Sequence, residues 1–472
     1  MLPTEPTFKD PLLSTRGTST MKTFLTTLLI LLSLAPVTAA EQTPNFIVIF
    51  ADDQGYQDLG CFGSPNIKTP NIDQMAKEGI RFTDFYSGYC VCSASRASLL
   101  TGCYQPRISM RGVLGPHSKV GLNPDEVTIA DMLKKKNYAT AMVGKWHVGD
   151  QPETLPTSQG FDSYFGLAYS NDMARQRGWG NGPADLDKIW KLKKWDIYNN
   201  EIYRNQEKIE SPVNQVTLTD RYTDECLKFI KANAKRPFYL HMCHAMPHVP
   251  LFVSDERYNP DPKTAYRLTI EHMDHSVGRI LKALDELGIA DNTFVVYTSD
   301  NGPWLSKKHH GGSALPLRAG KTTTFEGGMR VPCVMRWPAG IKPGQVTGRV
   351  AATIDVLPTF ASLAGITLDP SRPIDGRDIS QLLKDPQATS PHAEEGYYYY
   401  RNNKVEAVRI GDWKLSFRGK MPELYDLGKD ISESQNVAAE NADVVAQIRK
   451  VADAYHAKLM KERRPAWTAA KK

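Results

Sequence analysis

The chain has 472 residues, of which 41% are hydrophobic, and a formal net charge of +6. This length and composition allow a large core without help from disulfides, in two or three domains or in one large α/β domain with an appendage. The small positive excess contains no Lys/Arg block, so the charge does not predict nucleic-acid binding. The seven cysteines are scattered rather than set in CxxC pairs, which argues against zinc, and their odd number leaves at least one thiol unpaired or otherwise used.

The first forty residues have the layout of a secretory signal. A charged start at Lys22 precedes the apolar run FLTTLLILLSLAPV, and small residues end at Ala40. The run is too short to span a bilayer comfortably, and no comparable run follows. We therefore expect an upstream extension at 1–20, a signal peptide at 21–40, and an exported protein (periplasmic, secreted or, in a eukaryote, lumenal) without a membrane anchor after cleavage.

Strand-like and helix-like segments then alternate. The apolar, β-rich run Asn45-Phe-Ile-Val-Ile-Phe50 predicts a buried strand that ends at the carboxylates of Asp52 and Asp53. Further strands are expected at 140–143, 237–241, 293–298 and 331–336, and helices at 128–133, 218–234 and 270–284. This alternation predicts an α/β fold, a mostly parallel sheet sandwiched by helices, with ligands bound beyond the carboxyl ends of the strands.

The pattern changes near residue 385. Short antiparallel strands are expected at 397–400, 405–410 and 413–417, joined by Asn-Asn and Gly-Asp turns, and a last helix at 439–460. We therefore divide the expected mature chain into a large domain, 41–385, and a smaller C-terminal α+β subdomain, 386–472.

The sharpest local motif runs from Cys92 to Arg96, Cys-Ser-Ala-Ser-Arg, and leads into a helix-like stretch. A cysteine at a helix N-terminus near an arginine is expected to have a depressed pKa and to lie beside an anion-binding dipole. The residues alone leave two interpretations open, a reactive thiol or a buried structural cysteine.

This motif, with the following Leu-Thr-Gly, resembles the sulfatase signature Cys-X-Pro-Ser-Arg and Leu-Thr-Gly-Arg, in which the cysteine is oxidised to formylglycine. Other blocks in family order are IFADDQGYQDLGCFG from Ile49, TPNIDQMAKEGIRFTDFYS from Thr69, GKWHVG from Gly144, PHVP from Pro247, TSDNGP from Thr298, GKTTTFEGGMRVP from Gly320, GDWKL from Gly411 and ELYDL from Glu423. The sequence is thus similar to formylglycine-dependent type I sulfatases, nearest to the arylsulfatase A and N-acetylgalactosamine-6-sulfatase branch. The resemblance implies an alkaline phosphatase-like fold and hydrolysis of a sulfate ester.

The resemblance also implies roles for single residues. Cys92 would become 3-oxoalanine, whose hydrate is the nucleophile. The expected ligands of one calcium ion are Asp52, Asp53, Cys92, Asp300 and Asn301, and hard oxygen ligands at strand ends suit that ion. The expected catalytic residues beside Cys92 are Arg96, Lys145, His147, His248, Asp300 and Lys321. The expected substrate-binding residues are Lys145, Ser170, His248 and Lys321.

In the implied reaction, Asp300 or His248 protonates the leaving oxygen, and His147 assists loss of the second hydroxyl proton. Two residues depart from the signature: Ala94 replaces the usual Pro, and Cys103 replaces the Arg after Thr-Gly. Both lie in the stretch read by the formylglycine-generating maturation enzyme, which is an expected partner. Cys103 either pairs with another cysteine such as Cys90 or only fills space.

Two other functions remain open: a phosphoesterase or phosphonate hydrolase of the same superfamily, and an inactive exported glycan-binding homologue. The first usually binds two metals, whereas the set here suits one. The expected substrate is a sulfated glycan or small molecule, with a simple aryl sulfate as surrogate. Its specificity is expected in the loop 172–197, rich in Trp, Lys and Asn, with His309 and His310 as candidate specificity-loop residues; the loop could equally be only a long surface segment.

Overall fold

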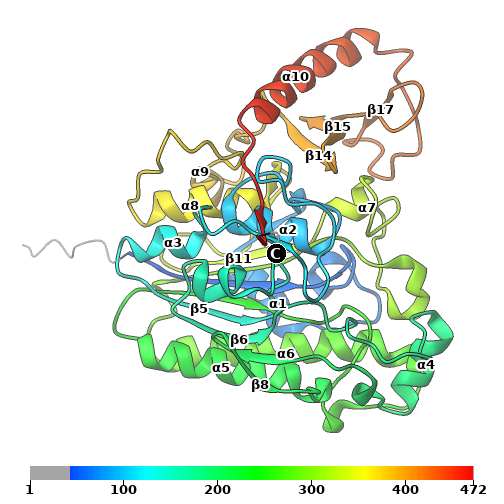
Figure 1. The fold of residues 1–472 in the computed structure, drawn as a ribbon. Helices are drawn as coiled ribbons and strands as arrows, with labels where there is room; N and C mark the ends of the chain where they lie inside the picture. Colours follow the sequence, from blue (N-terminus) through cyan, green and yellow to red (C-terminus); the bar gives the residue numbers. More distant parts are fainter. Residues whose placement is uncertain (1–42, 471–472) are drawn as a thin grey trace, which may run out of the picture. The chain divides into compact units, whose positions relative to one another are not determined.

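The computed structural model describes residues 43–470 (Figure 1). The signal peptide expected at 21–40 and the extension expected at 1–20 lie outside the described residues. Among the helices of the described part, none is both long and apolar enough to cross a membrane.

The main sheet has ten strands. They are β1 (Asn45–Ala51), β2 (Ile80–Phe82), β5 (Ala139–Gly144), β6 (Ser163–Leu167), β7 (Ile202–Arg204), β8 (Glu207–Glu210), β9 (Phe238–Cys243), β10 (Thr293–Ser299), β11 (Cys333–Arg336) and β12 (Gln345–Thr347). Their order is β12-β2-β11-β10-β1-β9-β5-β6-β7-β8. The five central strands, from β10 to β6, run parallel, and antiparallel pairs flank them on both sides. The predicted α/β fold is therefore confirmed, with strands close to all five expected positions.

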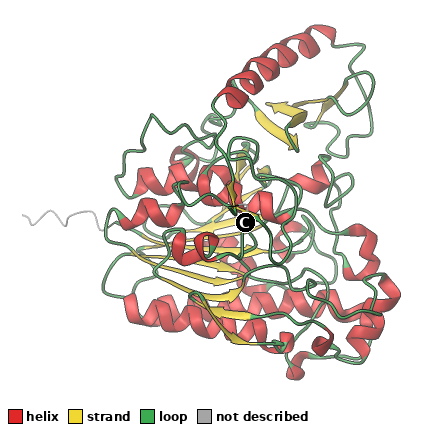
Figure 2. Cartoon of the chain, in the orientation of Figure 1, coloured by secondary structure: helices red, strands yellow, loops and turns green. Residues whose placement is uncertain are grey.

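Helices cover both faces of this sheet (Figure 2). One face carries α1 (Pro70–Glu78), α4 (Pro183–Lys191), α5 (Leu218–Asn233) and α6 (Ala265–Glu286). The other carries α2 (Cys92–Thr101), α3 (Ile129–Lys134), α8 (Val356–Leu363) and α9 (Ser380–Lys384). The three helices expected from the sequence correspond to α3, α5 and α6.

Strand β1 shows why its sequence is continuously apolar. Phe46, Val48 and Phe50 face one core cluster, while Ile47 and Ile49 face the other, and all five are fully buried. Successive side chains of a strand point to opposite faces, so a strand covered on both sides needs apolar residues at every position. The buried strand β1 ends at Ala51, so Asp52 and Asp53 lie directly beyond the edge of the sheet.

A smaller antiparallel sheet follows the main one. It consists of β14 (Tyr397–Arg401), β15 (Lys404–Ile410), β16 (Trp413–Ser416) and β17 (Glu423–Asp426), in that order. Helix α10 (Ala442–Lys461) shares a core cluster with it. Three of these strands and the helix are the expected ones, whereas β17 lies in the ELYDL block and was not predicted as a strand.

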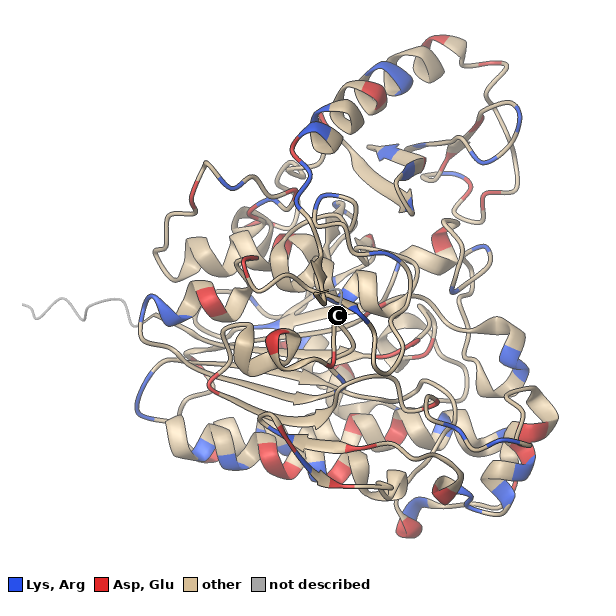
Figure 3. Ribbon diagram, viewed as in Figure 1, with Lys and Arg blue, Asp and Glu red and all other residues tan. Residues whose placement is uncertain are grey.

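Two small sheets complete the architecture. Strand β13 (Ala351–Ala352) pairs with β3 (Phe85–Tyr86), and β18 (Trp467–Thr468) pairs with β4 (Val120–Gly121). The second pairing brings the chain back from α10 to the segment between α2 and α3, as the red segment in Figure 1 shows. On the surface, Lys/Arg and Asp/Glu are interspersed along α4, α5 and α10 (Figure 3).

Candidate active site

Two neighbouring strands end at one edge of the main sheet. Strands β1 and β10 pair in parallel, and Ala51 stands opposite Ser299, so the residues that follow both strands leave the sheet side by side. The backbone N–H of Asp53 donates to Asp300 Oδ1 at 3.1 Å, and Asn301 Nδ2 donates to Asp53 Oδ1 at 2.7 Å. The register thus gathers the carboxylates in one buried group.

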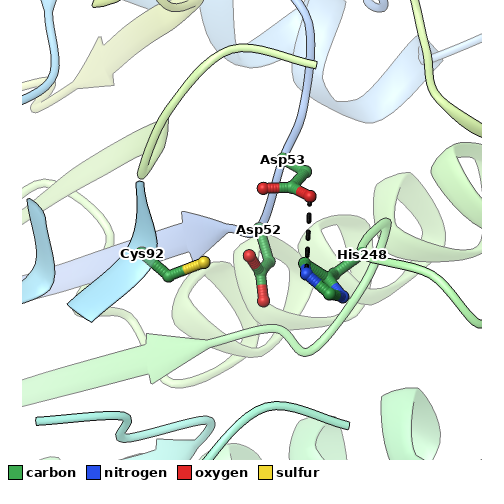
Figure 4. A group of neighbouring side chains, drawn as sticks. All are labelled: Asp52, Asp53, Cys92 and His248. Atoms are coloured by element: carbon green, nitrogen blue, oxygen red, sulfur yellow. Dashed lines mark ion pairs between the residues drawn. The ribbon is translucent and has the colours of Figure 1, made fainter. Parts of the chain in front are cut away.

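Cys92 reaches the same group from helix α2, of which it is the first residue. One ligand atom each of Asp52, Asp53, Cys92 and His248 lies within 4.8 Å of all the others. Figure 4 shows the sulfur of Cys92 pointing toward the two aspartates. All four residues are buried, which gives the group a low local dielectric.

Two lysines contact these carboxylates. Lys145, which follows β5, forms an ion pair with Asp52 and donates to Ser170 Oγ at 3.1 Å. Lys321 Nζ donates to Asp53 Oδ2 at 2.7 Å and lies 3.6 Å from Cys92 Sγ. Both ammonium groups are therefore held against the candidate metal site and the candidate nucleophile.

Each nitrogen of the Arg96 guanidinium donates a hydrogen bond within the protein. Its Nε and Nη2 donate to Asp300 Oδ2 at 3.1 and 2.9 Å, and its Nη1 donates to the carbonyl of Lys145 at 3.0 Å. Arg96 therefore orients Asp300 and the backbone at Lys145. Its Nη2 also lies 3.5 Å from Asp52 Oδ2.

The segment from Gly302 to Thr322 connects the end of β10 to the residues just before α2. The N–H of Lys321 donates to the carbonyl of Pro303, and that of Thr322 donates to the carbonyl of Cys90, each at 2.9 Å. A Cβ on Gly302 would stand 1.8 Å from the carbonyl oxygen of Gly327, so only glycine allows this close approach. These contacts tie the end of β10 to the start of α2.

The two histidines are held as neutral rings. His147 Nε2 donates to the carbonyl of Leu114 at 2.8 Å, and His248 Nδ1 donates to the carbonyl of Val249 at 2.7 Å. Burial, then the charges of Lys145 and Arg96, hold the pKa of His147 well below its usual value. Burial and the charge of Lys321 also lower the pKa of His248. Each ring therefore keeps one nitrogen free of a proton, Nδ1 in His147 and Nε2 in His248.

Burial and neighbouring charges shift the pKa values of Asp52 and Asp300 in opposite directions. For Asp52, burial acts to raise the pKa, but the cations of Lys145 and Arg96 outweigh it and lower the pKa. Burial and the charge of Asp52 raise the pKa of Asp300 to about 7, against the opposing effect of Arg96. Two adjacent carboxyl groups with opposite shifts are typical of functional sites.

The expected depression of the Cys92 pKa is wrong. Burial raises the pKa of this thiol to about 12, and the nearby Lys145 and Lys321 only partly oppose it. The sequence suggested the cations and the helix N-terminus but not complete burial, which penalises the thiolate more strongly. An unmodified Cys92 is therefore a protonated thiol at neutral pH and a poor nucleophile.

A hard cation fits this group of residues. Asp52 Oδ1 and Asn301 Oδ1 are buried, and neither has a hydrogen-bond partner within the part of the chain that the structure describes. Buried oxygens without partners are costly, and calcium binds such carboxylate and amide oxygens. The orphaned oxygens therefore match the expected ligand type.

Sequence reasoning missed two residues beside the site. The Trp304 ring lies 5.5 Å from that of His248, and Lys321 Nζ lies 4.5 Å from the Trp304 ring centre. Lys307 Nζ lies 4.1 Å from the same ring. Trp304 directly follows the TSDNGP block, and this position next to a site motif could have identified it as a residue beside the site.

The cysteines are unpaired. All seven are free thiols, so the expected alternative of a disulfide from Cys103 to Cys90 is wrong in this structure. Cys103 is fully buried, and its Sγ accepts from Arg464 Nη2 at 3.3 Å. The second alternative, that Cys103 fills space, agrees with its burial.

Comparison with known proteins gives two family matches. Residues 44–366 match the Sulfatase model, and residues 320–464 match the model "N-sulphoglucosamine sulphohydrolase, C-terminal". The chain is 35% identical over 447 residues to the N-acetylgalactosamine-6-sulfatase of Canis lupus familiaris, covering 91% of this chain and 83% of the dog protein. It is 35% identical over 460 residues to arylsulfatase A of Homo sapiens, covering 89% of this chain and 88% of the human protein.

A search of solved structures also finds a similar fold. The structure of Ps i-CgsB in complex with k-i-k-neocarrahexaose matches with a TM-score of 0.77 and 31% identity, covering 91% of this chain and 96% of that chain.

Proposed function

Because the chain belongs to the sulfatase family and is a sulfuric ester hydrolase, we propose that it cleaves a sulfated carbohydrate with a formylglycine made from Cys92 and one calcium ion. The observation that carries the proposal is the convergence of Cys92 with Asp52, Asp53 and His248 in one buried group. A buried, protonated thiol is chemically inert there, whereas the hydrate of an aldehyde supplies a hydroxyl that can attack sulfur.

Asp52, Asp53, Asp300, Asn301 and residue 92 would hold the calcium ion. The ion would supply positive charge toward the sulfate oxygens. Three of these residues are carboxylates, and Arg96, Lys145 and Lys321 already match them in number. A bound dication would therefore leave a net positive site, which favours a sulfate ester anion.

Lys145, Lys321 and His248 are proposed to bind the sulfate, with Ser170 orienting Lys145. Both lysines are buried beside Cys92, so their charges are strong and need little reorganisation when charge develops on the leaving oxygen. Ser170 accepts from Lys145 Nζ at 3.1 Å, which limits the positions that this ammonium can adopt.

His248 is the better candidate for the acid that protonates the leaving oxygen, because a bound sulfate ester anion would favour a proton on its Nε2. Asp300 accepts from the N–H of Asp53 with one oxygen and from Arg96 with the other, so both are occupied. The Nε2 of His248 has no such internal hydrogen bond and lies 3.6 Å from Asp53 Oδ2. For His147, the bare Nδ1 is the atom that can take a proton from a hydroxyl at position 92.

A sulfated glycan is the proposed substrate. Trp304 offers a flat surface beside Lys321, and Lys307 adds a further cation on the same ring. Aromatic rings pack against sugar faces, and lysines pair with acidic groups. A relative that acts on N-acetylgalactosamine 6-sulfate and a structural neighbour bound to a neocarrahexaose support this class.

The family match favours sulfatase activity over the phosphoesterase alternative. The ratio of turnover on an aryl sulfate to turnover on the matching aryl phosphate tests this choice. A ratio above one supports the proposal, whereas faster phosphate release would favour the alternative.

Mass spectrometry of the peptide that carries residue 92 tests the nucleophile. In protein made in a host that matures sulfatases, we expect a mass about 18 Da below that of the cysteine peptide. An unmodified thiol across several competent hosts would exclude the formylglycine mechanism and favour the glycan-binding alternative. We also propose export and cleavage near residue 41, and the intact mass of the same protein reports whether residues 1–40 have been removed.

Calcium removal is expected to abolish turnover and to weaken the fold. Treatment with a calcium chelator should lower the rate at least about 100-fold, and the free energy of unfolding should fall by about 3–4 kcal/mol relative to saturating calcium. Restoring calcium should recover both, while equal magnesium should recover little because that ion keeps its waters and prefers octahedral geometry. Full activity in excess chelator would contradict a calcium site.

A further inference from the structure

A second group of metal-ligating side chains lies outside the active site. It joins Asp187, on α4, to His309 and His310, at the end of the short 3-10 helix Leu305–His310, called η8. Nε2 of His309 and Nε2 of His310 lie 2.8 and 2.9 Å from the same oxygen, Asp187 Oδ1. Two imidazoles from adjacent residues thus converge on one carboxylate oxygen.

The backbone is bent to make this convergence. In a regular helix, the side chains of adjacent residues point in different directions. Here the helix is interrupted at Lys308, just before the two histidines, where φ is 55°. A left-handed lysine costs of order 1–3 kcal/mol and persists only where the surroundings enforce it. The kink lets both rings face α4, with their centroids 4.4 Å apart.

We propose that Asp187, His309 and His310 form a binding site for a divalent transition-metal ion, with zinc as the best match. Two imidazole nitrogens and one carboxylate oxygen are borderline ligands that suit zinc, whereas calcium prefers oxygen alone. Tetrahedral ligands of zinc stand about 3.3 Å apart, so the three atoms need to separate by about half an ångström. The spacing of the cysteines argues only against a zinc site with thiolate ligands, so it does not exclude a site made of two histidines and an aspartate.

The surroundings of the three ligands suit an ion that enters from solvent. The side chains of Asp187 and His309 are 32% and 31% exposed, while that of His310 is 1% exposed. The exposed pair gives access, and the buried ring anchors the site. All three ligand atoms lie within 4.8 Å of one another.

The proposed site would hold in place a segment that lies beside the candidate active site. The 3-10 helix η8 follows Trp304 and contains Lys307, the residues beside Lys321, and Lys307 Nζ donates to the carbonyl of Asn181. An ion at Asp187 would add a second tie between this helix and the segment that leads into α4. This role is separate from the calcium proposed for catalysis, whose ligands lie on other elements.

Zinc binding to the calcium-loaded full chain tests the proposal. We expect the wild-type protein, incubated with zinc chloride in excess calcium and passed through a desalting column, to keep one zinc equivalent by elemental analysis. The variants Asp187→Asn and His309→Ala should each lose that equivalent. The matched control His275→Ala removes another exposed imidazole, on α6, and should keep it.

A second measurement separates metal binding from folding. Zinc should raise the melting temperature of the wild type and of His275→Ala but not that of Asp187→Asn, while all four proteins should melt alike in calcium alone. No retained zinc in the wild type, or equal retention in Asp187→Asn, would overturn the proposal. Neither result would affect the formylglycine at position 92, which is read from the peptide mass.

Discussion

Replacing Cys92 with alanine is expected to lower kcat/KM for an aryl sulfate by at least about 10⁴-fold, since knocking out a nucleophile commonly costs this much or more. The change removes the atom that attacks sulfur but leaves Lys145, Lys321 and the carboxylates in place. Binding should survive, because these cations meet the sulfate in the ground state as well. Steady-state kinetics and the affinity for a sulfated glycan, measured by calorimetry, separate the two effects.

Cys90→Ala is the matched control. Cys90 is also buried, two residues upstream of Cys92, and its thiol is not among the group that contacts the carboxylates. Its loss should change kcat/KM by less than tenfold and stability by about 1 kcal/mol, the size of a small buried truncation. A Cys92→Ala enzyme within tenfold of the wild type would place the nucleophile elsewhere.

The features that could be predicted from the sequence are those that a continuous run of residues determines, such as a buried strand and the residues at its end. Strand β1 could be recognised because its residues from Phe46 to Ala51 are all apolar, and such a run is typical of a strand covered on both faces. Its end then located Asp52 and Asp53, and parallel pairing with β10 predicted that Asp300 lies nearby. These steps need only periodicity and the rule that parallel strands end at one edge.

Other features depend on contacts between distant segments and have no local signal. Strand β6, with polar Ser163 at its start and a glycine in its middle, lacks a continuous apolar run and was not predicted. The hydrogen bonds of Arg96 to Asp300 and to the backbone could not be read from a motif that records only residue type. The raised pKa of Cys92 follows from burial by many segments at once, so the nearby cations alone gave the wrong direction.

The smaller sheet contributes a buried contact to the active-site segment. Lys414, on β16, is fully buried, and its Nζ donates to Glu326 Oε1 at 2.9 Å and to the carbonyl of Thr324 at 3.0 Å. It also pairs with Glu433 Oε1 at 2.7 Å. Thr324 and Glu326 follow Lys321 within one short stretch, so the C-terminal sheet holds the loop that carries Lys321, the proposed sulfate-binding cation.

Lys414→Met is therefore expected to lower the free energy of unfolding by about 3–5 kcal/mol, measured by urea denaturation in calcium. Methionine nearly fills the volume of lysine, so the loss comes from two buried carboxylates left without their cation and not from a cavity.

Lys429→Met is the control, because Lys429 also pairs with a carboxylate, Asp426, at 2.8 Å but is 85% exposed. An exposed pair contributes little to stability, since water and ions screen it. Equal losses in the two variants would mean that burial adds nothing at Lys414. A larger loss at Lys414, together with a raised KM, would show that the smaller sheet stabilises the fold and also positions Lys321.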